Sequence, residues 1–388
     1  MDIPFNRPYL SGRELKYVRE VLENIQNGLP ISGDGYYTKK IQSFFEQEFH
    51  SKKALLTTSC TSALELATHL LDFKPEDEVI VPSFTFSSTV NPIILAGAKP
   101  VFADINDDTF NIEIESIKTQ ISSKTRAIYP MHYAGVACQM NEIMEIAQEN
   151  DLKVVEDAAH SVNAKYRNKY LGTIGDFGCY SFHESKNYTC GEGGALLINT
   201  DEISLWERAE IIREKGTNRS KFFRGEVDKY LWVDIGSSYL PSDILAAFLY
   251  AQLETLDEIQ KQRLKIWNAY YDGLRIFEDE GLLRLPVVPE YSNHNAHLFY
   301  VLFNSGSMRD QMMNGLGERG VHAVFHYLPL HLSPMGMRLG YKKGDFPITE
   351  NVSERLLRLP VYAGMKDSEI EYVLESFRDV IRKNNFPG

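Results

Sequence analysis

A lysine and an aspartate in this sequence have the side chains and the settings that amine–carbonyl chemistry requires. Lys186 lies in the polar run 181–189, and Asp157 ends a short strand-like run that begins with the apolar residues Val154 and Val155. A lysine amine condenses with an aldehyde as a Schiff base. A carboxylate after apolar residues is costly without a partner; a protonated pyridine ring is one such partner, and a helix cap is the alternative. The two residues together predict a pyridoxal 5′-phosphate site, in which Lys186 carries the aldehyde and Asp157 keeps the ring nitrogen charged.

Hydroxyl side chains at the start of a predicted helix could hold the phosphate of this cofactor. The segment 58–64 places Cys60, Thr61 and Ser62 where an apolar strand gives way to a helix. Free N–H groups and the helix dipole favour a phosphate dianion there. The same residues could form an ordinary N-cap, which most helices have.

An aromatic residue and a histidine follow two of the predicted strands. Phe86 could lie flat on the pyridine ring, or it could be a core residue. His160 could contact the ring or its phenolate oxygen. Alternatively, it could cap a helix or lie in the core with its ring nitrogens hydrogen-bonded. The run 191–194 has the glycines of a dinucleotide-binding loop, but it precedes a strand rather than a helix, and this context excludes the motif.

Short apolar runs alternate with longer amphipathic segments over the first part of the chain, and this alternation predicts the elements that position these residues. We expect strands at 54–58, 78–82, 100–104, 127–131 and 153–156, and helices at 13–26, 38–49, 60–71, 88–96 and 140–150. The pattern indicates an α/β fold with a mostly parallel sheet covered on both faces. Ligands bind beyond the carboxyl ends of the strands in such sheets.

The remainder of the chain predicts a smaller α+β unit. We expect one long helix over 243–276, with room for a bend, then strands at 297–303 and 322–326 and helices near 308–319, 349–357 and 367–384. We therefore divide the chain into a large cofactor-binding domain, 1–250, and a small C-terminal domain, 251–388.

Composition excludes several classes of protein. A net charge of −12 argues against a general nucleic-acid or membrane-surface binder. No apolar stretch has the length of a membrane span, and the N-terminus lacks a signal-peptide pattern, so we expect a cytoplasmic protein. No metal site is expected, because the cysteines form no CxxC pair and no metal-ligand spacing with histidine: Cys60, Cys138, Cys179 and Cys190.

Over essentially its whole length the chain resembles the sugar-nucleotide aminotransferases of the DegT/DnrJ/EryC1/StrS family, most strongly at 156–160, 181–187 and 191–194. The resemblance implies fold-type I architecture, with pyridoxal 5′-phosphate as cofactor and pyridoxamine phosphate as its intermediate form. It implies that Lys186 is the Schiff-base lysine and Asp157 the pyridinium partner. The other implied cofactor contacts are Phe86 on the ring, His160 beside it, and Thr61, Ser62 and Ser181 at the phosphate.

The resemblance also implies a homodimer or higher homo-oligomer with sites at the subunit interface. Many members supply an Asn from the neighbouring subunit to the phosphate. In the run 236–240 of this chain, Ser238 stands at that position. The cross-subunit phosphate contact is therefore in doubt, although the fold is not.

A basic segment could bind the diphosphate of a nucleotide sugar, although a solvated basic loop is the alternative. Its cations are Arg213, Lys215, Arg219, Lys221 and Arg224. The runs 216–225, 237–239 and 325–331 resemble family members that aminate C4 of dTDP-4-dehydro-6-deoxy-D-glucose with L-glutamate. The resemblance implies the product dTDP-4-amino-4,6-dideoxy-D-galactose, a precursor of surface polysaccharides such as enterobacterial common antigen and O-antigen. The substrate contacts expected on this basis are His132, Tyr133, Asn187, Arg219, Arg224 and His326.

Three alternatives remain open from the sequence. A transaminase for a C3-keto or a UDP-linked keto sugar would use the same cofactor residues. A sugar dehydratase of the same fold is disfavoured, because such relatives carry His at the position of Lys186. A non-catalytic sugar-nucleotide binding or regulatory protein would not need Lys186, Asp157 and Ser181 together.

Overall fold

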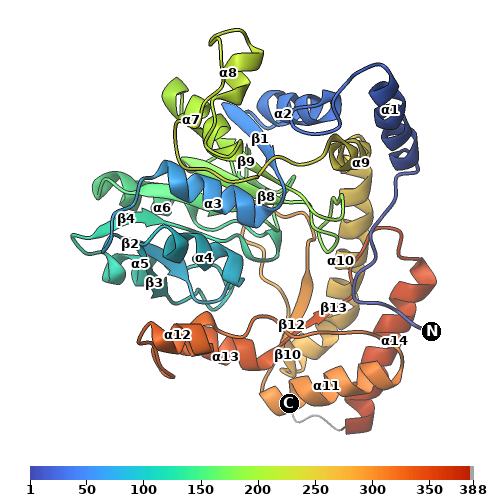
Figure 1. Cartoon of the computed structure of the whole chain (residues 1–388). Helices are drawn as coiled ribbons and strands as arrows, with labels where there is room; N and C mark the ends of the chain where they lie inside the picture. The colour runs from blue at the N-terminus through green and yellow to red at the C-terminus, as the bar shows by residue number, and fades with distance from the viewer. Residues whose placement is uncertain (385–388) are drawn as a thin grey trace.

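The computed structural model describes residues 1–384, so the last four residues of the predicted C-terminal domain lie outside it. Its centre is a seven-stranded sheet in the order β1-β9-β8-β5-β4-β2-β3 (Figure 1). Strand β9 is antiparallel to both of its neighbours, and the other adjacent strands are parallel. The strands are β1 (Lys53–Thr57), β2 (Glu78–Pro82), β3 (Lys99–Ala103), β4 (Thr125–Ile128), β5 (Lys153–Asp157), β8 (Phe177–Ser181) and β9 (Gly194–Ile198). The predicted mostly parallel α/β sheet is confirmed.

Helices cover both faces of this sheet, because successive strand residues point to opposite sides. Leu55 of β1 packs with α3, α4 and α7, whereas Leu56 packs with α2 and α9. Ile80 of β2 packs with α5 and α6. The helices of this part are α1 (Glu14–Gln26), α2 (Tyr36–Glu48), α3 (Cys60–Leu70), α4 (Ser87–Leu95), α5 (Ile114–Gln120), the 3₁₀ turn η1 (Tyr133–Gly135), α6 (Met140–Glu149), α7 (Ile203–Arg213), α8 (Arg219–Phe223) and α9 (Asp243–Leu253).

The C-terminal part has its own small sheet, in the order β10-β12-β13, with helices packed around it (Figure 1). Its core includes Trp267, Phe299 and Phe377 and takes in Ile3 from the N-terminus. A second small sheet, β11-β6-β7, joins this part to the loop after β5. The elements are β6 (Lys165–Tyr166), β7 (Lys169–Tyr170), α10 (Leu256–Asp279), β10 (Leu283–Arg284), β11 (Ser292–Asn293), β12 (Phe299–Phe303), α11 (Gly306–Glu318), η2 (Leu330–Leu332), α12 (Pro334–Arg338), α13 (Pro347–Arg355), β13 (Leu356–Leu359) and α14 (Asp367–Asn384).

Three predicted elements differ from the structure in type, continuity or end, and the strand predicted at 127–131 is formed at Thr125–Ile128 instead. The helix predicted over 243–276 is two helices, because α9 ends at Leu253 and Thr255 leaves the helical conformation before α10 begins. The strand predicted at 322–326 is not formed: Val324 makes only an isolated bridge to Arg358. The helix predicted over 349–357 ends at Arg355, because the next four residues pair with β12 as β13.

The predicted division at residue 250 falls inside α9 and stays a prediction. Core packing changes along α10: Ile259 belongs to the cluster of the large sheet, whereas Ile266 belongs to that of the C-terminal part. Within residues 1–384, no helix combines the length and the apolar character that crossing a membrane would need.

Candidate active site

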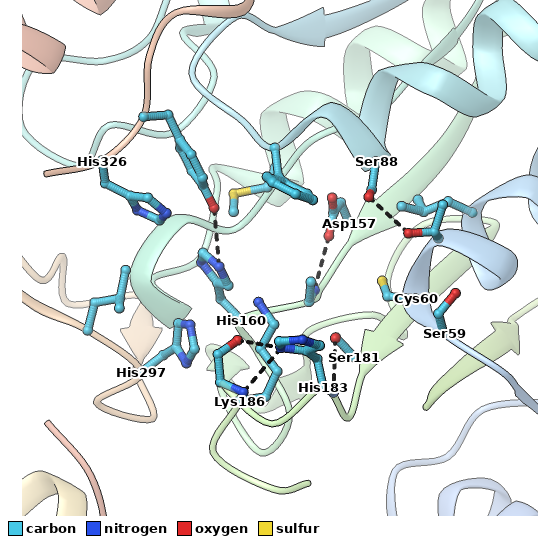
Figure 2. Close-up of a pocket in the computed structure, with 18 of the residues that line it drawn as sticks. Ser59, Cys60, Ser88, Asp157, His160, Ser181, His183, Lys186, His297 and His326 are labelled. Carbon is cyan, nitrogen blue, oxygen red and sulfur yellow. Dashed lines mark hydrogen bonds between the residues drawn. The ribbon is translucent and has the colours of Figure 1, made fainter. Parts of the chain in front are cut away.

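A cavity of about 390 Å³ opens at the carboxyl ends of the central strands, as the fold class predicts. Asp157 is the last residue of β5 and Ser181 the last of β8, and both line it. Lys186 lines it from the loop that follows β8. Figure 2 shows Ser59, Cys60 and Ser88 on one side of the site and His160, His297 and His326 on the other, with Asp157 and Lys186 between them.

The first of these sides is the N-terminus of α3. Ser59 caps this helix, since its Oγ accepts a hydrogen bond from the Ser62 N–H at 3.0 Å. Thr61 donates its hydroxyl hydrogen to Ser88 Oγ at 2.9 Å, and both residues line the cavity with Cys60. Free N–H groups and nearby hydroxyls suit a phosphate dianion. Ser62 is directed to Ser59 and Thr58 and is not part of the cavity lining.

Strand β9 packs closely against the start of α3, and this packing requires a glycine at position 194. A Cβ on Gly194 of β9 would lie 2.3 Å from the carbonyl carbon of Ser59. No side chain fits at that distance. Gly194 therefore fixes how closely the start of α3 approaches the sheet.

Asp157 is buried, and its two oxygens have partners. Oδ2 accepts a hydrogen bond from Thr89 Oγ1 at 2.6 Å, and Oδ1 accepts one from the Ala159 N–H at 3.1 Å. These contacts hold the carboxylate at the cavity wall in one orientation. Held in this way, Asp157 can accept a hydrogen bond from a protonated ring nitrogen.

The side chain of Lys186 is half-buried in the wall of the cavity. Burial lowers the pKa of Lys186, with Cys60 and Asp157 opposing the shift. An amine with a lowered pKa is more often neutral, and the neutral form is the nucleophile and the base. Burial also raises the pKa of the Cys60 thiol, which keeps that cysteine protonated.

Three histidines form the opposite side of the cavity. The ring of His160 lies 4.1 Å from that of His297 and 6.1 Å from that of His326, measured between centroids. Burial lowers the pKa of all three, so they are neutral. His160 Nε2 is 3.4 Å from the Tyr327 hydroxyl, and its Nδ1 is buried with no partner among residues 1–384.

These groups fit pyridoxal phosphate. The cavity brings together an amine, a held carboxylate and a helix N-terminus, and it leaves an unpaired imidazole nitrogen that a ligand could satisfy. Phe86 also lines the cavity, and 59% of its surface is exposed, so one of its faces is available to a ring. No group of metal-ligating side chains occurs within the described residues.

Two predicted substrate residues are buried outside the cavity lining. His132 Nδ1 accepts the Cys138 N–H at 3.1 Å, so Nε2 carries the proton and donates it to Glu156 at 2.9 Å. His132 therefore belongs to the packing behind β5. The hydroxyl of Tyr133 lies 3.2 Å from His326 Nδ1 and supports that ring from behind.

Asn187 also lies behind the cavity wall rather than in it. Its side-chain oxygen is 2.8 Å from His297 Nδ1, and its nitrogen donates to the Asn295 carbonyl at 3.0 Å. These contacts make it a support for His297.

The basic segment 213–224 lies outside the cavity of its own chain, and most of its cations are already paired. Arg213 is fully buried against Asp34 at 2.6 Å. Arg219 lies 3.6 Å from Glu214, and Arg224 pairs with both Glu210 and Glu226. Carboxylates thus lie beside these cations within one chain, and the contact of Arg219 and Arg224 with a nucleotide diphosphate stays a prediction. Ser238 is likewise exposed and outside the cavity.

Several residues of the site were not found from the sequence: Ser59, Ser88, His183, Glu192, His297, Tyr327 and Arg358. Ser88 could have been found, since it begins a predicted helix just beyond a strand. Arg358 comes from a distant segment that no local pattern marks, whereas Tyr327 lies in the run 325–331 that carries part of the family resemblance, next to the predicted His326.

Comparisons with known proteins agree with this geometry. The family model described as the DegT/DnrJ/EryC1/StrS aminotransferase family matches residues 9–378. The spore coat polysaccharide biosynthesis protein SpsC of Bacillus subtilis is 33% identical, with 98% of this chain and 97% of the relative covered. The uncharacterized protein MJ1066 of Methanocaldococcus jannaschii is 36% identical, with 98% of each chain covered.

A solved structure shares the fold over nearly the whole chain. The PMP-form of the putative sugar aminotransferase Spr1654 from Streptococcus pneumoniae has a TM-score of 0.90 at 25% identity, with 99% of this chain and 98% of that chain covered. The same protein is also solved in a PLP-form. The chain therefore belongs to the DegT/DnrJ/EryC1/StrS family and is a pyridoxal-phosphate-dependent sugar aminotransferase of fold type I.

Proposed function

We propose that this aminotransferase moves the amino group of L-glutamate to C4 of dTDP-4-dehydro-6-deoxy-D-glucose, giving dTDP-4-amino-4,6-dideoxy-D-galactose for surface polysaccharides. The observation that carries the transfer is the meeting of Lys186, Asp157 and the α3 N-terminus in one cavity. The choice of sugar is supported by the resemblance of segments 216–225 and 325–331 to C4-aminating members. The name of the relative SpsC, a polysaccharide biosynthesis protein, supports the pathway.

Each residue of the cavity has a distinct task in this proposal. The bound cofactor supplies an electron sink for charge that develops at the reacting carbon. Asp157, oriented by Thr89, keeps the ring nitrogen protonated, and Ser59, Thr61 and Ser88 hold the phosphate at the start of α3. Phe86 and His160 contact the ring.

Lys186 moves the protons. Its neutral amine takes the proton from the α-carbon of L-glutamate, and in the second half of the reaction it returns a proton to C4 of the sugar. Because Lys186 reaches the site from one side only, the proton arrives on one face of the sugar and sets the configuration at C4.

We further propose that a second copy of the chain completes the site. The segment around Ser238 and the neighbouring basic loop lie outside the cavity of their own chain. Next to this loop, large apolar side chains are exposed, and 80% of the surface of Trp232 is accessible. Exposed apolar side chains beside a polar loop suit a subunit interface. A partner could then bring Ser238 or Arg219 to the neighbouring cavity.

The test is to incubate the holoenzyme with L-glutamate and dTDP-4-dehydro-6-deoxy-D-glucose and to determine the product by NMR. An axial amine at C4 is expected. An equatorial C4 amine, or a product only from C3-keto or UDP-linked sugars, would overturn the substrate assignment while leaving the transaminase intact.

A further inference from the structure

A glutamate that no step of the reaction uses lies fully buried next to Asp157. Glu156 precedes Asp157 on β5. Because successive strand residues point to opposite faces of a sheet, its side chain points away from the cavity that Asp157 lines. A buried carboxylate is costly unless hydrogen bonds replace the water that it loses. The hydrogen-bond partners of Glu156 therefore show what this carboxylate holds in place.

Four donors surround the Glu156 carboxylate. Oε1 accepts the N–H groups of Ile174 and Gly175, both at 2.7 Å. Oε2 accepts the N–H of Gly172 at 2.8 Å and the Nε2–H of His132 at 2.9 Å. Three of these donors belong to the loop that leads into β8, and the fourth belongs to the segment that follows β4.

The same two segments hold the backbone of Asp157. On one side, the Asp157 N–H donates to the Pro130 carbonyl at 2.9 Å, and the Asp157 carbonyl accepts the His132 N–H at 3.2 Å. On the other side, Asp157 pairs with Cys179 of β8. Glu156 thus ties together the two neighbours of Asp157 from the opposite face of the sheet.

Both of these neighbours also contribute to the cavity wall. Met131 forms a parallel bridge with Asp157 and lines the cavity. Ser181 ends β8 and lines the cavity, and Lys186 follows in the next loop. The hydrogen bonds of Glu156 therefore also fix where Asp157 lies relative to Lys186.

We propose that Glu156, through His132 and the loop 172–175, is a positioning residue that holds Asp157 in line with the ring nitrogen of the cofactor. This inference rests on the role proposed above for Asp157. A hydrogen bond depends on both distance and direction, so a small shift of the Asp157 backbone weakens the contact with the ring nitrogen. His132 then acts on the site from behind β5, without contact with the substrate.

Glutamine at position 156 removes the charge and the hydrogen bonds while keeping the volume. An amide has one acceptor oxygen, and its NH2 group would face two N–H donors in either orientation. Two of the four donors would then be buried without a partner, which is costlier than removing both members of a pair. We expect the segments on the two sides of Asp157 to shift while the chain stays folded.

The experiment observes the ring nitrogen directly. Each variant is loaded with pyridoxal phosphate that carries ¹⁵N in its ring, and the NMR signal of that nitrogen reports whether it is protonated. Asp157→Asn gives the signal expected when the partner is lost. Glu156→Gln should move the signal part of the way toward it and lower kcat by roughly 10-fold. The KM values for L-glutamate and the keto sugar should stay within about threefold of wild type.

The matched control is Glu14→Gln. Glu14 is also a buried carboxylate surrounded by donors, and it is not part of the cavity lining. Its donors are the N–H groups of Ser11 and Gly12 and the side-chain amide of Gln252. Glu14→Gln should unfold at lower urea concentration than the wild type but keep the wild-type nitrogen signal and kcat.

A second variant tests the pair from its other member. His132→Phe removes one donor and leaves the three backbone hydrogen bonds of Glu156 in place, so it carries the test if Glu156→Gln does not fold. It should shift the nitrogen signal in the same direction as Glu156→Gln. An altered KM for the keto sugar with an unchanged nitrogen signal would overturn the inference and return His132 to the substrate contacts.

Glu156→Gln itself can also overturn the inference. A wild-type nitrogen signal and a wild-type kcat, at a stability like that of Glu14→Gln, would make Glu156 a structural residue only. If Asp157→Asn keeps the wild-type signal, the role proposed for Asp157 fails, and the inference about Glu156 falls with it. The nitrogen signal requires no sugar, so an acceptor other than the proposed one leaves the test intact.

Discussion

The carboxylate of Asp157 shows how a single residue is prepared for its role. Two hydrogen bonds fix it, and both donors come from within the site, Thr89 and the Ala159 backbone. Asp157→Asn keeps the volume but removes the charge that a protonated ring nitrogen requires. We expect the variant to bind the cofactor and to lose about 100-fold or more in kcat. Measuring kcat beside the visible absorption of the bound cofactor checks this, with the exposed Asp310→Asn as control. A kcat within threefold of wild type would contradict the role.

A second prediction at this scale concerns stability and pH. Burial lowers the pKa of His294, packed against Trp267, to about 4. An unfolded histidine titrates near 6.5, so below that pH the unfolded chain binds a proton that the folded chain refuses. The contribution of neutral His294 to the free energy of unfolding is therefore fully present above about pH 6.5. It falls by about 1 kcal/mol per pH unit as the pH drops toward 4.

Urea denaturation at pH 7, 6 and 5 measures this dependence. His294→Gln should flatten it, whereas His322→Gln, at an exposed histidine, should leave it as in the wild type. An unchanged slope in His294→Gln would contradict the assignment.

At the scale of elements, the approach of β9 to α3 sets the phosphate end of the site. Gly194→Ala would force a Cβ against the Ser59 backbone and displace the start of the helix. We expect a loss of about 1–3 kcal/mol in the free energy of unfolding, together with weaker cofactor binding.

The matched control is Gly317→Ala in α11, where a Cβ meets no atom within 4 Å. That change should stabilise the protein by about 0.5–1 kcal/mol. Chemical denaturation of the two variants measures both changes in the free energy of unfolding. Equal stability and equal cofactor binding in the two variants would show that the close approach of β9 to α3 does not set the phosphate end of the site.

The elements also explain what could be predicted from the sequence. The central strands are short apolar runs between helical patterns, so their existence and the position of Asp157 after β5 follow from local signals. Strand β13 could not be predicted from local signals. Its pairing with β12 joins segments far apart in the chain and overrides a helical pattern. Arg358 lies on β13, and so its place in the cavity was hidden as well. His132 follows a predicted strand at the correct edge, but its ring turns to Glu156, which no sequence pattern reveals.

For the whole molecule we predict a homodimer. Leu231, Trp232 and Val233 form an exposed apolar run beside the basic loop. Light scattering on a sizing column should give twice the chain mass. Trp232→Asp should shift the protein toward monomer and reduce activity, because a large aromatic at an interface carries much of the binding energy. Ile276→Asp, at another exposed apolar position, should leave both the dimer and the activity unchanged. A fully active monomer would contradict a shared site.

The central claim is that Lys186 carries the cofactor in the cavity that Asp157 and the start of α3 complete. Borohydride reduction of the holoenzyme, followed by proteolysis and mass spectrometry, tests it directly, since reduction fixes the cofactor to the amine that holds it. The account predicts the phosphopyridoxyl group on the peptide that contains Lys186, and no labelled lysine in Lys186→Ala. A label on any other lysine as the main product, or labelling that persists in Lys186→Ala, would contradict it.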